Sequence, residues 1–225
     1  MTLKRSLGAA LLYTTLISTS CAQMEERNAT SAQRNPADLA STIIDSHAIE
    51  LRQRPLKMGN EYNIYVEGQK VGEIKENIFS WGDHFDIYAG DSTLKIGSAQ
   101  QKLLSWGYET QVLDGNGQAV GTLNEKIFKW KPGHQIEIQD RYGRTLTTAE
   151  QRLLTFAFKA DLYGPNKETH GKSERDFIWS NYRTSLTESA PDIDGRLLAM
   201  LCVAEDKMQQ RDAEDDSDDD DDDDD

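Results

Sequence analysis

A bulky apolar residue followed two positions later by an aromatic one recurs through the middle of this chain. The spacing between copies is about 25 residues, which is typical of a supersecondary unit repeated along the chain. Residues i and i+2 of a β-strand point to the same face. Each pair therefore predicts a strand, and the repeats predict an aromatic-rich layer on one side of a meandering antiparallel sheet. The pairs are Phe79 with Trp81, Leu104 with Trp106, Phe128 with Trp130, and Leu154 with Phe156.

A strand–turn–strand segment precedes each of these pairs. "YNIYV" and "KVGEI" flank "EGQ", and "TQVLD" and "QAVGTL" flank "GNG". Apolar and polar residues alternate in these segments, and Gly and Asn tolerate the positive φ of a tight hairpin turn. Gly72, Gly97 and Gly121 recur at the same point of each unit. The pattern predicts consecutive β-hairpins, with a weaker fifth copy beginning at Ala160.

The segment Asp114–Glu125 also resembles a calcium-binding EF-hand loop. Asp114, Asn116 and Glu125 occupy ligand positions of such a loop. The sixth position needs Gly for a sharp turn, but here it is Ala119. The flanking sequences are typical of strands rather than helices, so we interpret this segment as a hairpin.

The last predicted element is a helix at about 196–208, with Asp192 or Asp194 as its N-cap. Leu197–Ala204 is apolar on every side, and a helix of that kind is buried. Cys202 lies in this stretch and is interpreted as a small core residue. One buried helix after a series of hairpins predicts a sheet wrapped around it.

Hairpins such as "VLDGNGQAVGTL", followed by an apolar C-terminal helix, resemble the tubby C-terminal-like superfamily. Within it the chain is most similar to the LURP-one-related and phospholipid-scramblase-like group. The resemblance covers roughly Leu51 to Asp206. It implies a mainly β fold, an antiparallel barrel of about twelve strands around the helix.

The predicted domain order is a signal peptide (1–22), a polar tether (23–50), the barrel (51–206) and a poly-Asp tail (209–225). Ala37–Leu51 is predicted as either a short helix or a first strand. The run 212–225 holds twelve acidic residues and no basic one, so without it the net charge of −14 falls to −2. Such a run favours a disordered, solvating tail. The alternative is a weak, multivalent site for cations or for a basic partner. The chain contains no basic stripe, which argues against nucleic acid as a partner.

The N-terminus has the three parts of an export signal: Lys4 and Arg5, the apolar stretch Leu7–Ile17, and small residues after it. Cys21 at the end of the apolar stretch resembles the lipid acceptor of bacterial lipoproteins. Cleavage after Ala22 is the alternative. We therefore predict export to the periplasmic side of a bacterial membrane, with a lipid anchor if Cys21 is modified.

Three lysines beside an aromatic residue form the predicted lipid contact: Lys126, Lys129, Trp130 and Lys131. Such a group is suited to anionic lipid headgroups. Tubby-like relatives bind phosphoinositides, and the resemblance implies the same chemistry here. The alternative is a strand with its polar face in water.

No catalytic residue, metal site or cofactor is predicted, because nucleophile and phosphate-binding motifs are absent from the sequence. His84 and His134 follow equivalent points of two repeats and are expected in loops at one end of the barrel, whereas His47 and His170 are expected to be solvent-exposed. The predicted function is a non-enzymatic envelope protein that binds a lipid, an apolar ligand or a protein. The alternatives are an interaction module without a small ligand and a periplasmic enzyme of unrecognised type.

Overall fold

A computed structural model describes residues 34–54, 59–80, 82–102, 109–126, 134–152, 158–176 and 181–218. The described part consists of two helices and twelve strands. The helices are α2 (Pro36–Ile44) and α3 (Gly195–Asp218). The strands are β1 (Ala48–Gln53), β2 (Glu61–Val66), β3 (Gln69–Glu76), β4 (His84–Ala89), β5 (Leu94–Gln101), β6 (Glu109–Asp114), β7 (Ala119–Lys126), β8 (Gln135–Asp140), β9 (Thr145–Gln151), β10 (Lys159–Tyr163), β11 (Thr169–Arg175) and β12 (Asn181–Leu186).

Each strand pairs antiparallel with its neighbours in the sequence, and β1 pairs with β12 to close the barrel. The predicted mainly β fold of consecutive hairpins is confirmed. At Asp114–Glu125 the structure has the hairpin of β6 and β7: the Asp114 Oδ1 accepts from the backbone N of Asn116 at 2.9 Å and of Gln118 at 2.8 Å. Gly117 supplies the positive φ of this turn, at 80°.

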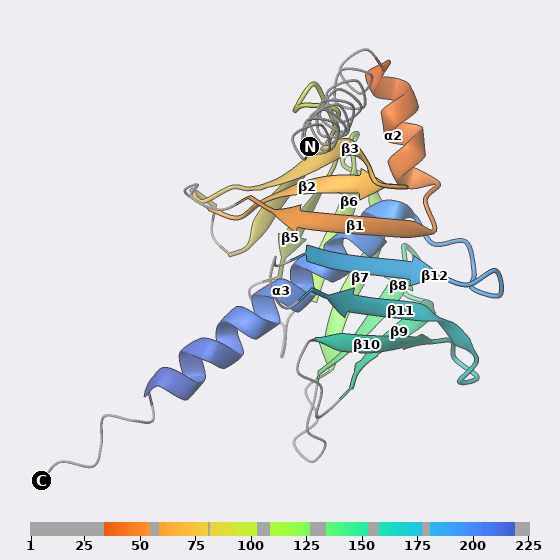
Figure 1. Cartoon of the computed structure of the whole chain (residues 1–225), viewed down its shortest axis with the longest axis vertical. Coiled ribbons are helices and arrows are strands. Elements are labelled where there is room, and N and C mark those ends of the chain that lie inside the picture. The colour runs from red at the N-terminus through yellow and green to blue at the C-terminus, as the bar shows by residue number, and fades with distance from the viewer. Residues whose placement is uncertain are drawn as a thin grey trace, which may run out of the picture.

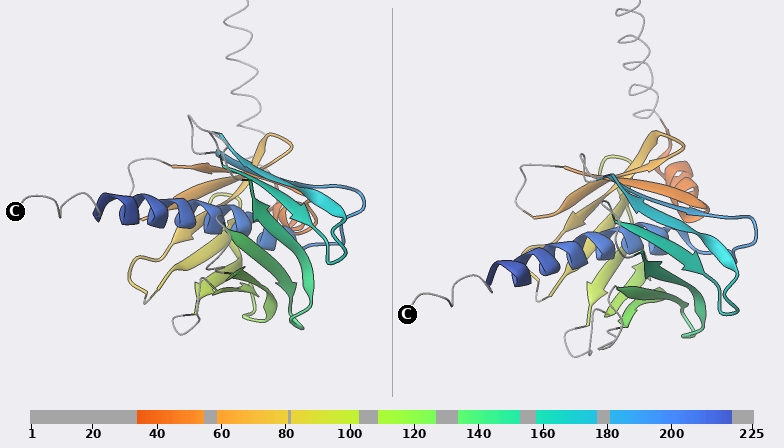
Figure 2. Two further views of the ribbon diagram at one scale, coloured as in Figure 1. Left: turned by 90° about the horizontal axis from the view of Figure 1, so that it is seen from below. Right: turned by 60° about the horizontal axis from the view of Figure 1, so that its bottom comes forward.

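Helix α3 runs through the barrel, as Figures 1 and 2 show. Every residue from Leu197 to Asp206 is almost fully buried, including Cys202. Alternate residues of the strands point inward and pack on the helix, for example Ile64, Ile87 and Ile138. The N-cap is Asp194, whose Oδ1 accepts from Arg196 N at 2.9 Å. The prediction of a buried central helix is therefore confirmed.

The two ends of the barrel differ. At the end that we call the hairpin end, short turns join β2 to β3, β4 to β5, β6 to β7, β8 to β9 and β10 to β11, and α2 packs there against β3, β4 and β5. At the opposite end, which we call the loop end, β1, β3, β5, β7, β9 and β11 finish and α3 leaves the barrel.

One strand prediction was wrong. Phe79 lies in a turn between β3 and β4 and is 92% exposed, instead of contributing to an aromatic layer on the sheet. The chain reverses direction at this turn. Residues two positions apart share a face only in an extended strand, so the rule does not apply to Phe79. Trp81 and the three later pairs lie outside the described residues.

The folded part extends beyond the predicted boundaries on both sides. The interval Ala37–Leu51 contains most of α2 and the start of β1, so both predicted alternatives occur there in succession. Because β1 begins at Ala48 and α2 packs on the barrel, the fold starts before residue 51. Helix α3 continues to Asp218, well into the segment for which disorder was predicted.

Among the described residues, no helix is both long and apolar enough to cross a membrane.

Candidate functional site

A carboxylate on α3 joins two tyrosines inside the barrel. Tyr62 OH donates to Asp206 Oδ2 at 2.6 Å, and Tyr182 OH donates to Oδ1 at 2.7 Å. Burial, and then the negative charge of Asp206, raise the pKa values of both tyrosines far above their ordinary value. These phenols therefore stay protonated and fix the helix to β2 and β12.

A second carboxylate on α3, Glu205, is fully buried. Ser173 Oγ donates to its Oε2 at 2.7 Å, while Oε1 has no hydrogen-bond partner in the described part of the chain. Burial raises the pKa of Glu205 to about 8, and the Ser173 bond opposes this only in part. The neighbouring Cys202 thiol lies 3.1 Å from Thr184 Oγ1, and burial raises its pKa as well. None of these groups faces solvent, so the cluster has no route to a substrate.

The Glu205 proton makes stability depend on pH. The folded pKa of about 8 exceeds the ordinary value of 4.5, so the folded chain holds this proton more tightly than the unfolded chain. The resulting stabilisation is present below pH 4.5 and is lost as the pH rises to about 8. Relative to wild type, Glu205→Gln should gain up to about 1.4 kcal/mol of unfolding free energy per pH unit in this window. Urea unfolding at pH 5, 7 and 9 measures this gain, with the exposed Glu188→Gln as control; a difference that does not change with pH would contradict it.

Ion pairs surround α3 where it leaves the barrel at the loop end. Lys207 Nζ lies 2.8 Å from Glu76 Oε1 and 3.5 Å from Asp83 Oδ1. Arg211 Nη2 lies 2.9 Å from Glu125 Oε2. We call these five residues the exit collar. They connect the helix to β3, to β7 and to the segment before β4.

Two carboxylates of the exit collar, Glu76 and Glu125, have lowered pKa values. Burial alone would raise the pKa of Glu76, but hydrogen bonds from Lys207 and Asn60 lower it below its ordinary value. Burial would also raise the pKa of Glu125, but hydrogen bonds with His134 and Arg211 lower that pKa below its ordinary value. Both carboxylates are therefore charged at neutral pH and hold the cationic side chains of α3. The exit collar therefore ties α3 to the barrel wall at the loop end.

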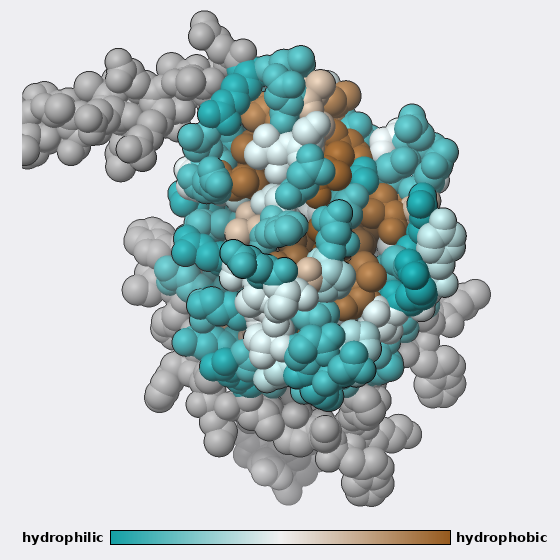
Figure 3. Space-filling model, turned by 90° about the vertical axis from the view of Figure 1, so that its right-hand side faces the viewer, coloured by the Kyte–Doolittle hydropathy of each residue, from teal (hydrophilic) through white to brown (hydrophobic). Residues whose placement is uncertain are grey.

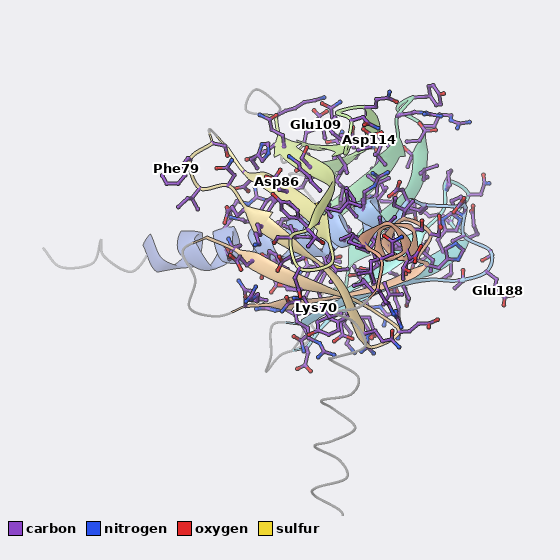
Figure 4. The ribbon with its side chains drawn as sticks, turned by 90° about the horizontal axis from the view of Figure 1, so that it is seen from above. Lys70, Phe79, Asp86, Glu109, Asp114 and Glu188 are labelled. Carbon is purple, nitrogen blue, oxygen red and sulfur yellow. The ribbon has the colours of Figure 1, made fainter. Side chains whose placement is uncertain are left out.

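The most exposed apolar side chain of the described residues lies at the same end. Phe79 is 92% exposed and Ile78 is 46% exposed. Figure 4 shows Phe79 at the tip of the connection between β3 and β4, on the side where α3 leaves. Hydrogen bonds within the turn hold it: Phe79 N donates to Asn77 Oδ1 at 3.2 Å, and Ser80 Oγ donates to Asn77 O at 2.8 Å. An ordered turn thus presents an aromatic ring to solvent, which favours contact with another surface.

A polar hollow of about 390 Å³ lies on the outer wall near the loop end, where β10, β11, β12 and β1 meet. The acidic and basic side chains that line this hollow are equal in number. Glu50 accepts from Arg52 at 2.6 Å and from Arg183 at 2.6 Å, and although burial opposes them, these bonds lower its pKa. The lining holds three acidic and three basic residues, so its formal charge is zero. It is lined by Glu50, Lys159, Glu174, Arg175, Asp176, Asn181 and Arg183.

The hairpin end has a different surface. Figure 3 shows this face, on which hydrophobic residues form patches separated by hydrophilic ones. Partly buried side chains such as Val66, Val120 and Leu146 pack against the core. Tyr142 is 72% exposed in the turn between β8 and β9. This tyrosine provides an exposed aromatic residue at the opposite end for comparison with Phe79.

The predicted lipid-contact residues are only partly described. Lys126 ends β7, and its Nζ forms an ion pair with Glu137 of β8. That pair neutralises one of the three positive charges on which the prediction relied. Lys129, Trp130, Lys131 and the predicted acceptor Cys21 lie outside the described residues.

Each histidine has a carboxylate neighbour. His134 Nδ1 lies 2.8 Å from Glu125 Oε1, and His84 Nε2 lies 3.4 Å from Asp86 Oδ1, both at the loop end. His170 was expected to be exposed, but it is 3% exposed, because it packs beside Glu168 at 3.3 Å under the turn between β10 and β11. His47 is exposed. In the described ranges, no group of three or more His, Cys, Asp or Glu residues could hold a metal ion.

Known proteins resemble this chain in sequence family and in fold. A family model described as LURP-one-related matches residues 70–212. A crystal structure of an Arabidopsis thaliana protein superposes with a TM-score of 0.50 and 15% identity, covering 75% of this chain and 95% of that one. At this identity the match shows the fold alone. A comparison with curated proteins finds no match.

Proposed function

Since this chain belongs to the LURP-one-related family, we propose that it is a non-enzymatic, exported binding module whose ligand contacts the loop end. The observation that carries this proposal is Phe79, 92% exposed on a hydrogen-bonded turn. The barrel interior is filled by α3, which leaves the outer surface for binding. The groups with strongly raised pKa values lie inside, away from solvent, and this favours binding over catalysis.

Export and anchoring complete the proposal. The signal at 1–22 directs the chain to the periplasmic side of a bacterial membrane, where Cys21 carries a lipid or is removed with the signal. Helix α2, the first described element of the chain, packs at the hairpin end. An anchor would therefore join the chain on the side opposite the loop end. The intact mass of the exported chain distinguishes a lipidated Cys21 from cleavage after Ala22.

Photocrosslinking tests the binding end. A photoreactive phenylalanine derivative at position 79 should crosslink to a lipid or a protein in intact cells, because this side chain would lie in the contact. The same group at position 142 is the matched control, since Tyr142 is also an exposed aromatic residue but lies at the hairpin end. Mass spectrometry of the product identifies its class. Equal crosslinking at both positions, or crosslinking at 142 alone, would contradict the proposal.

A further inference from the structure

The loop end combines an apolar turn with a strongly acidic helix. Helix α3 leaves the barrel there and continues to Asp218, on the side where Phe79 projects (Figures 2 and 4). After Arg211 the chain contains only acidic, Ala and Ser residues. Lys207 and Arg211, the last basic residues of the helix, are already paired with the carboxylates of the exit collar. We call Asp212–Asp218, the part of α3 after Arg211, the acidic extension; its sequence holds five acidic residues and no basic one.

The exit collar also fixes where the acidic extension begins. Its ion pairs join α3 to Glu76, Asp83 and Glu125 on the barrel wall. Phe79 is three residues from Glu76 and four from Asp83, so the same connection carries the exposed ring and the anchor of the helix. The exposed ring and the point at which α3 leaves the barrel are thus held at one end by shared residues. Preorganised contacts of this kind reduce the ordering cost of binding.

The two chemistries discriminate between possible partners. An anionic bilayer would cover Phe79 but would be repelled by the acidic extension, and a neutral bilayer would gain nothing from it. A small cation would pair with the acidic residues but would leave Phe79 exposed. A protein segment with apolar and basic residues side by side satisfies both features.

We propose that the loop end binds a basic, amphipathic protein segment, whose apolar side chains cover Ile78 and Phe79 while its Lys or Arg residues face the acidic extension of α3. This inference rests on the proposed function, because it assigns a partner class to the same end of the barrel. The lysine-rich contact predicted at Lys126 stays a separate prediction, because Lys126, paired with Glu137, is the one residue of that group that the structure describes.

Synthetic peptides test this partner class on the full exported chain. The probes are a fluorescent amphipathic helix of Leu and Lys and its counterpart of Leu and Glu, followed by anisotropy. The Leu–Lys peptide should bind, and the Leu–Glu peptide should not. Phe79→Ser should weaken binding about tenfold, because a buried aromatic contact is lost, whereas Tyr142→Ser at the hairpin end should leave it unchanged. Raising the salt from 0.05 to 0.5 M should weaken binding by screening the charges.

Two further variants locate the charge. Neutralising the acidic residues of the α3 extension should weaken binding of the Leu–Lys peptide about tenfold. Deleting 219–225 instead should weaken binding of the Leu–Lys peptide less than about threefold. These seven aspartates would contribute only a general electrostatic attraction, which salt screens. The first variant is Asp212→Asn, Glu214→Gln, Asp215→Asn, Asp216→Asn and Asp218→Asn combined.

Three results would overturn the inference. The first is no binding of the Leu–Lys peptide. The second is binding that is insensitive to Phe79→Ser, which would indicate general attraction to the acidic run. The third is flotation with phosphatidylglycerol vesicles that depends on Phe79, which would make a bilayer the occupant. The crosslinking experiment at position 79 tests the proposed function independently of these three results. A crosslink to lipid at that position would support a binding site at the loop end and would exclude a protein segment as its partner.

Discussion

Leu201→Asp is expected to prevent the chain from folding. Leu201 is fully buried in the middle of the Leu197–Asp206 part of α3, which the strands of the closed barrel surround. An Asp at this position would be a buried, unpaired charge, or a buried carboxylic acid with no hydrogen-bond partner supplied by its apolar neighbours. Either outcome costs roughly 3–5 kcal/mol or more. The lost leucine packing adds about 2–5 kcal/mol, and the sum is similar to the whole stability of a typical domain.

Soluble yield, circular dichroism and urea unfolding measure the effect of Leu201→Asp. Leu94→Asp is the matched control, because Leu94 is an exposed leucine at the start of β5 and the same substitution leaves the new charge in water. The control should unfold within about 0.5 kcal/mol of wild type. If Leu201→Asp instead unfolds cooperatively near the wild-type urea midpoint, α3 is not the core of the fold.

The barrel was predictable because its signals are local. Alternating apolar residues, and turn residues such as those at Asp114–Gly117, determine each hairpin within about a dozen residues. The uniformly apolar stretch Leu197–Ala204 similarly identifies a buried helix without knowledge of its neighbours. The closed arrangement around that helix then follows from family resemblance, since nothing local to β1 indicates that it pairs with β12.

The exposed turn was missed because its composition is ambiguous. An apolar residue two positions from an aromatic one suits a half-buried strand, and it equally suits a turn that meets another surface. The flanking Asn77 and Gly82 are the available signal: Asn77 accepts hydrogen bonds that close the turn, and Gly82 has a φ of 76°. Burial, however, is a tertiary property, and the exposure of Phe79 could not be derived from either residue.

The exit collar lies beyond sequence reasoning for another reason. Lys207 and Glu76 are 131 positions apart, and Arg211 and Glu125 are 86 apart. The chain has 39 acidic and 25 basic residues, so composition leaves very many possible pairs. Only the passage of α3 along the barrel axis selects these pairs. His170 is a similar case, because its burial depends on how the turn between β10 and β11 folds over it.

The sequence shows that glycines recur at the same point of each unit, and the structure shows why glycine is needed there. The pairing register shifts next to Gly72, Gly97 and Gly121 in three successive hairpins. A Cβ at these positions would lie 2.2 Å from Tyr88 O, 2.6 Å from Leu113 O and 2.3 Å from Gln139 O, respectively. The backbones of adjacent strands therefore approach too closely for any side chain.

Gly121→Ala is accordingly expected to destabilise the fold by about 3 kcal/mol, at the upper end of overpacking costs. Unfolded-chain entropy alone predicts the opposite sign, because Gly→Ala at a position of ordinary φ usually stabilises by about 0.4–1 kcal/mol. Urea unfolding of the full chain distinguishes the two effects: the unfolding free energy falls if crowding dominates and rises if unfolded-chain entropy dominates. Gly117→Asn is the control, since that position has open space around it and Asn tolerates its positive φ.

A second substitution separates backbone crowding from side-chain crowding at Gly121. The new methyl group would meet Leu197 Cδ1 at 3.0 Å as well as Gln139 O at 2.3 Å. Shortening the leucine in the double variant Gly121→Ala, Leu197→Ala removes the first contact but leaves the second. Because the backbone oxygen belongs to the β7–β8 ladder and cannot rotate away, the double variant should show no rescue beyond the additive sum of the single changes. Recovery of stability in the double variant would mean that the helix side chain, and not the close approach of the two strands, is what requires glycine.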